Sequence, residues 1–178
     1  FDKTGTLTKG EFEIQKIDVP SNYNEQEVLK YAAMGERFSN HPIAKSINLA
    51  FGQYAENLNV EDAKNYAGMG VSAVINGKKY YAGNEKLMRS VGVEFEETKL
   101  VGTAIYLCSE TEFLGNIVFA DVIKEDSKNA ISALCRDGVK KTVMLTGDKE
   151  PIAADIAQKA GIDEHFSRLM PDEKVERI

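Results

Sequence analysis

The sequence has 178 residues, of which 43% are hydrophobic, and a formal net charge of −6 at pH 7. A chain of this length can bury a sizeable core and can also hold one domain interrupted by a smaller one. The negative charge offers no basic surface to a phosphate backbone, which argues against a nucleic acid partner. No apolar run approaches the roughly 18 residues that a membrane-spanning helix requires, so we expect a soluble α/β protein.

The two cysteines and the two ends of the chain place further bounds on the protein. Cys108 and Cys135 lie far apart and outside any Cys-x-x-Cys pair, which predicts reduced structural thiols in the cytosol. The chain begins at Phe1 without a methionine and ends at Ile178 inside a predicted helix. We therefore expect a piece of a longer protein.

The middle of the chain, residues 17–114, has the pattern of an α+β domain. Apolar residues at helical spacing predict amphipathic helices over 25–37 and 42–54. The Asn76-Gly77 dipeptide favours a type I′ turn between strands 71–75 and 78–82. Asn84 is a candidate N-cap for a short helix that ends near residue 89, and a strand is predicted over 103–109.

Strands and helices alternate from residue 111 onward, which is typical of a parallel sheet with crossover helices. The predicted strands cover 113–120, 142–145 and 166–169, and the predicted helices cover 125–136, 151–160 and the residues from 172. The fold class predicted is therefore α/β. A Rossmann-like domain is expected from residues 1–16 and 115–178, and residues 17–114 are expected to form the inserted domain.

Two short polar segments each lie at the predicted end of a strand, where α/β folds place their chemistry. The first is Asp2-Lys3-Thr4-Gly5-Thr6-Leu7-Thr8, whose carboxylate could attack a phosphoryl group and form an aspartyl-phosphate. The second is Thr146-Gly147-Asp148, which is also a common helix N-cap sequence. Its hydroxyl and backbone N–H groups could hold phosphoryl oxygens.

The first segment resembles the phosphorylation signature DKTGT of P-type ATPases. Their phosphorylation domain belongs to the haloacid dehalogenase superfamily. The resemblance implies catalytic roles for Asp2, Lys3 and Thr4, the use of ATP and Mg²⁺, and Mg²⁺ contacts from the Asp2 carboxylate and the Thr4 backbone carbonyl. Many phosphatases of the superfamily carry a general acid/base aspartate where Thr4 stands. Without that group the acyl-phosphate should persist, which suits a pump.

Further catalytic and hinge residues follow from the same resemblance. The Thr146-Gly147-Asp148 segment is similar to the second superfamily motif, and Lys174 resembles the lysine that neutralises the nucleophile and the phosphate. Asp121 and Lys124 resemble the hinge motif that follows the insert, with lysine in place of the more usual arginine.

The insert contains residues that resemble the nucleotide site of heavy-metal P-type ATPases. Glu36 and His41, in Glu-x-x-Ser-x-His-Pro, resemble the adenine-site signature, although Asn40 stands where the family often has glutamate. A glycine-containing turn and the end of the hairpin complete the predicted nucleotide site. Its members there are Gly68, Gly70, Val71, Gly83 and Asn84.

The resemblance predicts the ATP-binding, aspartyl-phosphate-forming part of a heavy-metal pump, with zinc or cadmium favoured over copper. It implies a position on the cytoplasmic side of a membrane and partner transmembrane and actuator domains in the parent protein. The chain stops before the family's GDGxND segment, whose aspartates help to hold Mg²⁺, so its magnesium site is expected to be partial and its turnover weak. The piece alone is expected to be monomeric and to bind nucleotide. A copper pump, a stand-alone haloacid dehalogenase-type phosphatase and a purely nucleotide-binding module remain the alternatives.

Overall fold

The structure, a computed structural model, describes residues 1–36, 43–44, 46–48 and 59–177, with residues 34–36 described in their backbone only. The chain divides into two compact units. Unit 1 comprises Phe1–Glu11 and Asp121–Ile178, and unit 2 comprises Phe12–Ala120. Each unit has its own hydrophobic core.

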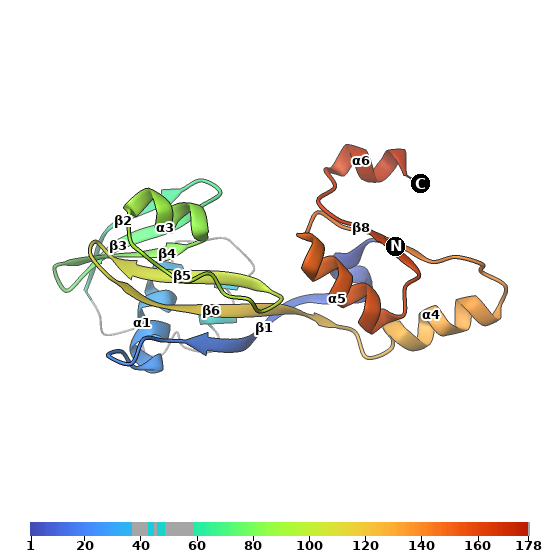
Figure 1. Ribbon diagram of the computed structural model, residues 1–178, viewed down its shortest axis with the longest axis horizontal. Helices are drawn as coiled ribbons and strands as arrows, with labels where there is room; N and C mark the ends of the chain where they lie inside the picture. The colour runs from blue at the N-terminus through green and yellow to red at the C-terminus, as the bar shows by residue number, and fades with distance from the viewer. Residues whose placement is uncertain (37–42, 45, 49–58, 178) are drawn as a thin grey trace. The chain divides into compact units, whose positions relative to one another are not determined.

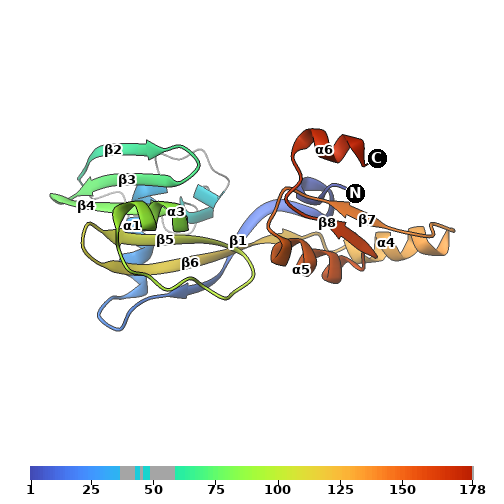
Figure 2. The ribbon, with the colours of Figure 1, turned by 45° about the horizontal axis from the view of Figure 1, so that its top comes forward.

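A six-stranded sheet is the framework of unit 2. Its strand order is β1-β6-β5-β4-β3-β2, and the pairs from β6 through β2 are antiparallel. Figure 2 shows these strands side by side. The strands are β1 (Thr8–Asp18), β2 (Val60–Tyr66), β3 (Gly70–Ile75), β4 (Lys78–Gly83), β5 (Thr103–Ser109) and β6 (Phe113–Ile123). β1 and β6 both run across the division between the units.

Helix α1 (Glu25–Glu36) covers one face of this sheet and helix α3 (Glu85–Val91) covers the other (Figure 1). α1 buries Val28, Leu29, Ala32 and Ala33, which recur at helical spacing on one side of the helix. α3 buries Leu87 and Met88 against β4 and β5. The sequence-predicted helices at both places are confirmed.

The β3–β4 hairpin is the clearest case in which local chemistry determines local structure. Ile75 pairs with Lys78, and the two residues between them, Asn76 and Gly77, have φ values of 51° and 78°. A type I′ turn requires two successive positive φ angles, which asparagine and glycine adopt at little cost. The predicted turn type is confirmed.

In its described residues, unit 1 contains a small parallel sheet, three α-helices and an irregular turn, Lys3–Leu7. β7 (Val143–Leu145) pairs in parallel with β8 (Glu164–Phe166), and Asp2 forms a parallel bridge with Leu145. The helices are α4 (Ser127–Arg136), α5 (Glu150–Ala160) and α6 (Pro171–Glu176). The core comprises Leu7, Ile131, Met144, Ala153, Ile156, Ala157, Ala160 and Ile162.

Three features differ from the sequence prediction or lie beyond it. β6 was expected in the parallel sheet, but it pairs antiparallel with β5, because only three residues separate the two strands and a parallel pair needs a much longer connection. β1 and β2 were not predicted. β1 alternates between exposed and partly buried positions from Lys9 to Gln15, which is a strand pattern that the sequence analysis missed, whereas the five inner positions of β2 are all exposed and give no such pattern. Of the predicted helix 42–54, residues 43–44 and 46–48 are helical, and the rest lies outside the described residues.

The predicted domain boundaries, 16/17 and 114/115, fall inside β1 and β6, and the point at which a separately folding domain would begin stays a prediction. In the part of the chain that the structure describes, no helix is both long and apolar enough to cross a membrane.

Candidate functional site

The carboxylate of Asp2 and the ammonium group of Lys174 form an ion pair in unit 1. Lys174 Nζ lies 2.5 Å from Asp2 Oδ1, and about half of the Asp2 side chain is exposed to solvent. Asp2 reaches this position because its backbone bridges Leu145, the last residue of β7. Lys174 is presented by α6, which begins at Pro171. A carboxylate beside a cation at the carboxyl end of parallel strands is the arrangement predicted from the sequence.

Lys3, the neighbour of Asp2, points the other way, into the protein. Its side chain is only 4% exposed, and its Nζ lies 2.8 Å from Asp148 Oδ2 and 2.9 Å from Asp121 Oδ2. Burial by itself lowers the pKa of Lys3, but its hydrogen bonds to the two carboxylates outweigh burial and raise that pKa. Lys3 is therefore a buried, charged residue.

The 146–148 turn follows β7 directly, as predicted. Thr146 Oγ1 donates a hydrogen bond of 2.6 Å to Asp148 Oδ2, and the Thr146 backbone N–H donates to Phe166 O. The Gly147 N–H has no hydrogen-bond partner among the described residues and lies on the surface. Burial favours a raised pKa for Asp148, but the hydrogen bonds from Lys3 and Thr146 outweigh it and hold this pKa below its usual value of 3.8.

The two predicted hinge residues contact the turn Lys3–Leu7. Asp121, nearly fully buried, accepts a hydrogen bond of 2.7 Å from Thr8 Oγ1 in addition to its ion pair with Lys3. Lys124 Nζ donates to Gly5 O at 2.7 Å, and the Lys124 backbone N–H donates to Leu7 O.

The structure thus brings together several of the predicted site residues: Asp2, Lys3, Asp121, Lys124 and the 146–148 turn. Thr4 lies within the turn, with φ −72° and ψ 125°.

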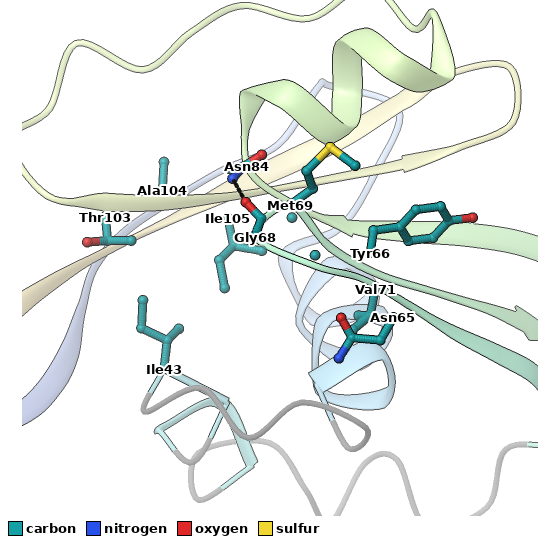
Figure 3. A pocket seen from close by; sticks show the side chains of 12 residues that line it. Ile43, Asn65, Tyr66, Gly68, Met69, Val71, Asn84, Thr103, Ala104 and Ile105 are labelled. Carbon is teal, nitrogen blue, oxygen red and sulfur yellow. Dashed lines mark hydrogen bonds between the residues drawn. The ribbon is translucent and has the colours of Figure 1, made fainter.

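A pocket of about 300 Å³ in unit 2 gathers the other group of predicted residues. Ile43, Ile105 and Thr103 line it together with the end of β2 (Figure 3). All five of the predicted nucleotide-binding residues in this part of the chain line the pocket: Gly68, Gly70, Val71, Gly83 and Asn84. Residues 36 and 41 could not be placed against it, because the Glu36 side chain and all of His41 lie outside the described residues.

Two of the pocket glycines are required by strand pairing. Gly70 and Gly83 are paired across β3 and β4. A Cβ on Gly70 would lie 2.2 Å from Ala82 O, and a Cβ on Gly83 would lie 2.2 Å from Met69 O. Gly68 differs, because it needs glycine for its φ of +70° and has open space where a Cβ would point. Of the three, Gly68 has the backbone that a ligand could approach most freely.

Asn84 joins the glycine turn to the start of α3. Its Oδ1 accepts from the backbone N–H groups of Lys86 and Leu87, as an N-cap does, at 3.0 and 3.3 Å. Its Nδ2 donates to Gly68 O at 2.8 Å, the dashed line in Figure 3. The predicted capping role is confirmed.

The structure adds pocket residues that the sequence did not reveal. Asn65 and Tyr66 come from β2, which was not predicted, and Thr103 and Ala104 come from the start of β5. No motif marks these positions. Only the pairing of β2 with β3 shows that Asn65 lies opposite Val71, a predicted site residue.

Comparisons with known proteins identify relatives of the whole chain. The chain is 42% identical over its full length to a zinc-transporting ATPase of Synechocystis sp. and 36% identical to a cadmium, zinc and cobalt-transporting ATPase of Bacillus subtilis. In each case it spans 25% of the relative's length. The sequence-based resemblance to heavy-metal P-type ATPases is thereby confirmed.

Solved structures lead to the same family. The chain matches a zinc-transporting PIB-type ATPase in its E2.Pi state with a TM-score of 0.76 and 29% identity, covering 100% of this chain and 30% of that one. It matches the catalytic domain of the CPx-ATPase CopB-B with a TM-score of 0.74 and 28% identity, covering 99% of this chain and 63% of that one. The family model for the haloacid dehalogenase-like hydrolases matches residues 1–175. With Asp2 at a strand end beside Lys174 and the 146–148 turn, the chain belongs to the haloacid dehalogenase-like hydrolase family.

Proposed function

We propose that this chain is the ATP-handling part of a P-type ATPase that exports heavy-metal cations, with zinc or cadmium favoured over copper. In this proposal Asp2 accepts the γ-phosphoryl group of ATP. The observation that supports it most strongly is the Asp2–Lys174 pair, with 2.5 Å between Oδ1 and Nζ, at the end of the parallel strands. The zinc- and cadmium-transporting relatives support the choice of cation.

The proposed reaction uses the groups of unit 1 in distinct ways. An oxygen of the Asp2 carboxylate attacks the γ-phosphorus, the bond from that phosphorus to the β–γ bridging oxygen breaks, and ADP leaves. Lys174 lies close enough to Asp2 to neutralise the added negative charge. The surface N–H of Gly147 is the donor in the 146–148 turn that remains available for a phosphoryl oxygen, since Thr146 already donates to Asp148.

The residues around Asp2 fit a magnesium ion that arrives with the nucleotide. Mg²⁺ is usually held by one or two carboxylates together with substrate phosphate oxygens and water, and a dedicated protein cage is uncommon. Asp2 supplies a half-exposed carboxylate, and the described residues include no group of three or more His, Cys, Asp or Glu side chains that could hold an ion alone. Asp2 and the Thr4 carbonyl would hold Mg²⁺, which would neutralise phosphoryl charge.

The pocket of unit 2 is the proposed ATP site, with Glu36 and His41 at the adenine. Replacing His41 with alanine is expected to weaken ATP binding by about 1–2 kcal/mol, the scale of one lost hydrogen bond or stacking contact. His165→Ala is the matched control, because His165 belongs to unit 1 and pairs with Glu150. Equal affinity for both variants and the unaltered protein in calorimetry would refute the adenine assignment.

The remaining parts of the proposal concern the whole parent protein. We place this chain on the cytoplasmic side of a membrane, joined to transmembrane and actuator domains. The test is to incubate the full-length protein with γ-labelled ATP and then add hydroxylamine, which cleaves acyl-phosphates. Label that survives hydroxylamine, or that appears on Asp2→Asn, would refute Asp2 as the acceptor. Stimulation of ATP hydrolysis by Zn²⁺ and Cd²⁺, but not by Cu⁺, is the expected cation dependence.

A further inference from the structure

The ammonium group of Lys3 is withdrawn from the place where a phosphoryl group would bind. It is buried between two carboxylates, Asp121 and Asp148, at 2.9 and 2.8 Å. Asp2, one residue earlier, is half exposed and faces Lys174. Two neighbouring residues of the same motif therefore have different surroundings, and only one of them is available to a substrate.

The backbone explains how burial of one side chain directs the other. Asp2 is extended, with φ −77° and ψ 154°. In an extended segment successive side chains point to opposite sides. A contact that holds Lys3 inward therefore turns Asp2 outward, toward Lys174.

The buried carboxylate of Asp121 is fixed from more than one direction. Its Oδ2 accepts from Thr8 Oγ1 at 2.7 Å and pairs with Lys3. The Thr8 hydroxyl is also 3.3 Å from Lys3 O, so Thr8, which follows the turn, contacts the residue at which the turn begins. Thr8 begins β1 and Asp121 lies near the end of β6. The network thus ties the turn after Asp2 to both strands that enter unit 1.

One oxygen of the Asp121 carboxylate has no hydrogen bond to offset its burial. Asp121 Oδ1 is buried and has no hydrogen-bond partner among the described residues. Buried carboxylate oxygens are normally satisfied, because desolvation without a partner is unfavourable. The buried Asp121 carboxylate therefore lowers stability through its unpaired oxygen. Its presence is more readily explained by the geometry that it imposes on its neighbours than by a stabilising role.

We propose that Lys3 and Asp121 are positioning residues: their buried ion pair, braced by Thr8, fixes the orientation of the Asp2 carboxylate for phosphoryl transfer. The inference rests on the proposed function of Asp2. It differs from a direct role for Lys3 at the phosphate, because the ammonium group acts through the backbone of the turn. Misplacement of a reacting group by ~1 Å can slow a reaction by ~10²-fold.

The test is single-turnover phosphorylation of the full-length protein from labelled ATP. Asp121→Asn and Lys3→Met are expected to lower the rate constant at saturating ATP by roughly 10- to 100-fold. The ATP concentration that gives half the maximal rate and the final labelled fraction should stay as in the unaltered protein. Lys159→Met, which removes an exposed pair with Asp155 in the same unit, is the control and should leave all three quantities unchanged.

A second pair of variants keeps the proposal testable if either charge variant fails to fold. Thr8→Ser retains the hydroxyl that braces Asp121 and should retain the rate constant, whereas Thr8→Val removes the hydroxyl at nearly constant shape and should lower it. An unchanged rate constant in folded Asp121→Asn, or in folded Thr8→Val, overturns the proposal. So does a labelled fraction that falls with the folded fraction while the rate constant stays constant, since that pattern indicates a purely structural role. Absence of hydroxylamine-sensitive label from the unaltered protein is a different result, which overturns the proposed function and this inference with it.

Discussion

Lys174 Nζ contacts Asp2 Oδ1 at 2.5 Å, although the two residues are 172 positions apart in the sequence. Both side chains are partly exposed. Exposed ion pairs contribute little to stability, with typical values of about 0–1 kcal/mol. The contact is therefore better suited to balancing the negative charge at Asp2 than to holding α6 in place.

Replacement of Lys174 by methionine should separate these two roles. We expect the rate of phosphorylation of Asp2 to fall by ~10²-fold or more, the scale seen when one preorganised charge-stabilising group is lost. The free energy of unfolding should change by less than about 1 kcal/mol. Quench-flow labelling and denaturant titration measure the two quantities, with Lys159→Met as the control. A full rate in Lys174→Met would remove Lys174 from the mechanism.

Asn84 should show separate effects on folding and on the pocket. Asn84→Ala removes the acceptor for Lys86 and Leu87 and should cost about 1 kcal/mol of stability, the usual effect of losing an N-cap. Asn84→Asp keeps the capping oxygen but loses the donor to Gly68 O. This second variant should keep most of the stability yet bind ATP more weakly. Equal ATP affinity in Asn84→Asp and the unaltered protein would show that the Gly68 contact does not shape the site.

Gly70 should tolerate no side chain. In Gly70→Ala the new Cβ would meet Ala82 O at 2.2 Å and Gly83 Cα at 2.6 Å, both backbone atoms that cannot yield without disturbing the β3–β4 pair. We expect a loss of stability of about 1–3 kcal/mol or more. Gly77→Ala is the control, because Gly77 also has positive φ but nothing within 4 Å of its Cβ position. If both variants unfolded at the same denaturant concentration, backbone strain alone would account for the effect.

The ionisation of Asp148 should make unit 1 sensitive to acid. Its pKa in the folded protein lies below 3.8, so protonation is easier in the unfolded chain. The resulting stabilisation is present in full above the unfolded pKa and is lost as pH falls through the folded pKa. The stability difference between the unaltered protein and Asp148→Asn should therefore be largest above about pH 4 and shrink at lower pH. Denaturant titrations from pH 7 to pH 3 measure it, and a difference independent of pH would contradict the assignment.

Local features determined a large part of this molecule from sequence alone. The spacing of apolar residues predicted α1, the alternation of strands and helices after residue 111 predicted α4 and α5, and Asn76-Gly77 predicted the hairpin with its turn type. The motifs at Asp2, at 146–148 and at Lys174 predicted one phosphoryl-transfer site; the structure brings Asp2 and Lys174 into contact, and their role in phosphoryl transfer stays a prediction. The structural predictions succeed because helix periodicity and turn angles depend on residues close together in the chain.

Other features were decided by the tertiary structure. The sequence predicts β6 as a strand, and its pairing with β5 shows which of the two sheets that strand joins. β2 becomes part of the pocket through its register with β3, which depends on residues outside β2. The inward direction of Lys3 likewise requires Asp121 and Asp148, which lie more than 100 positions away and have no fixed spacing from it. Strand partners and buried charge pairs depend on which surfaces pack together in the folded chain. A short stretch of sequence therefore does not specify them.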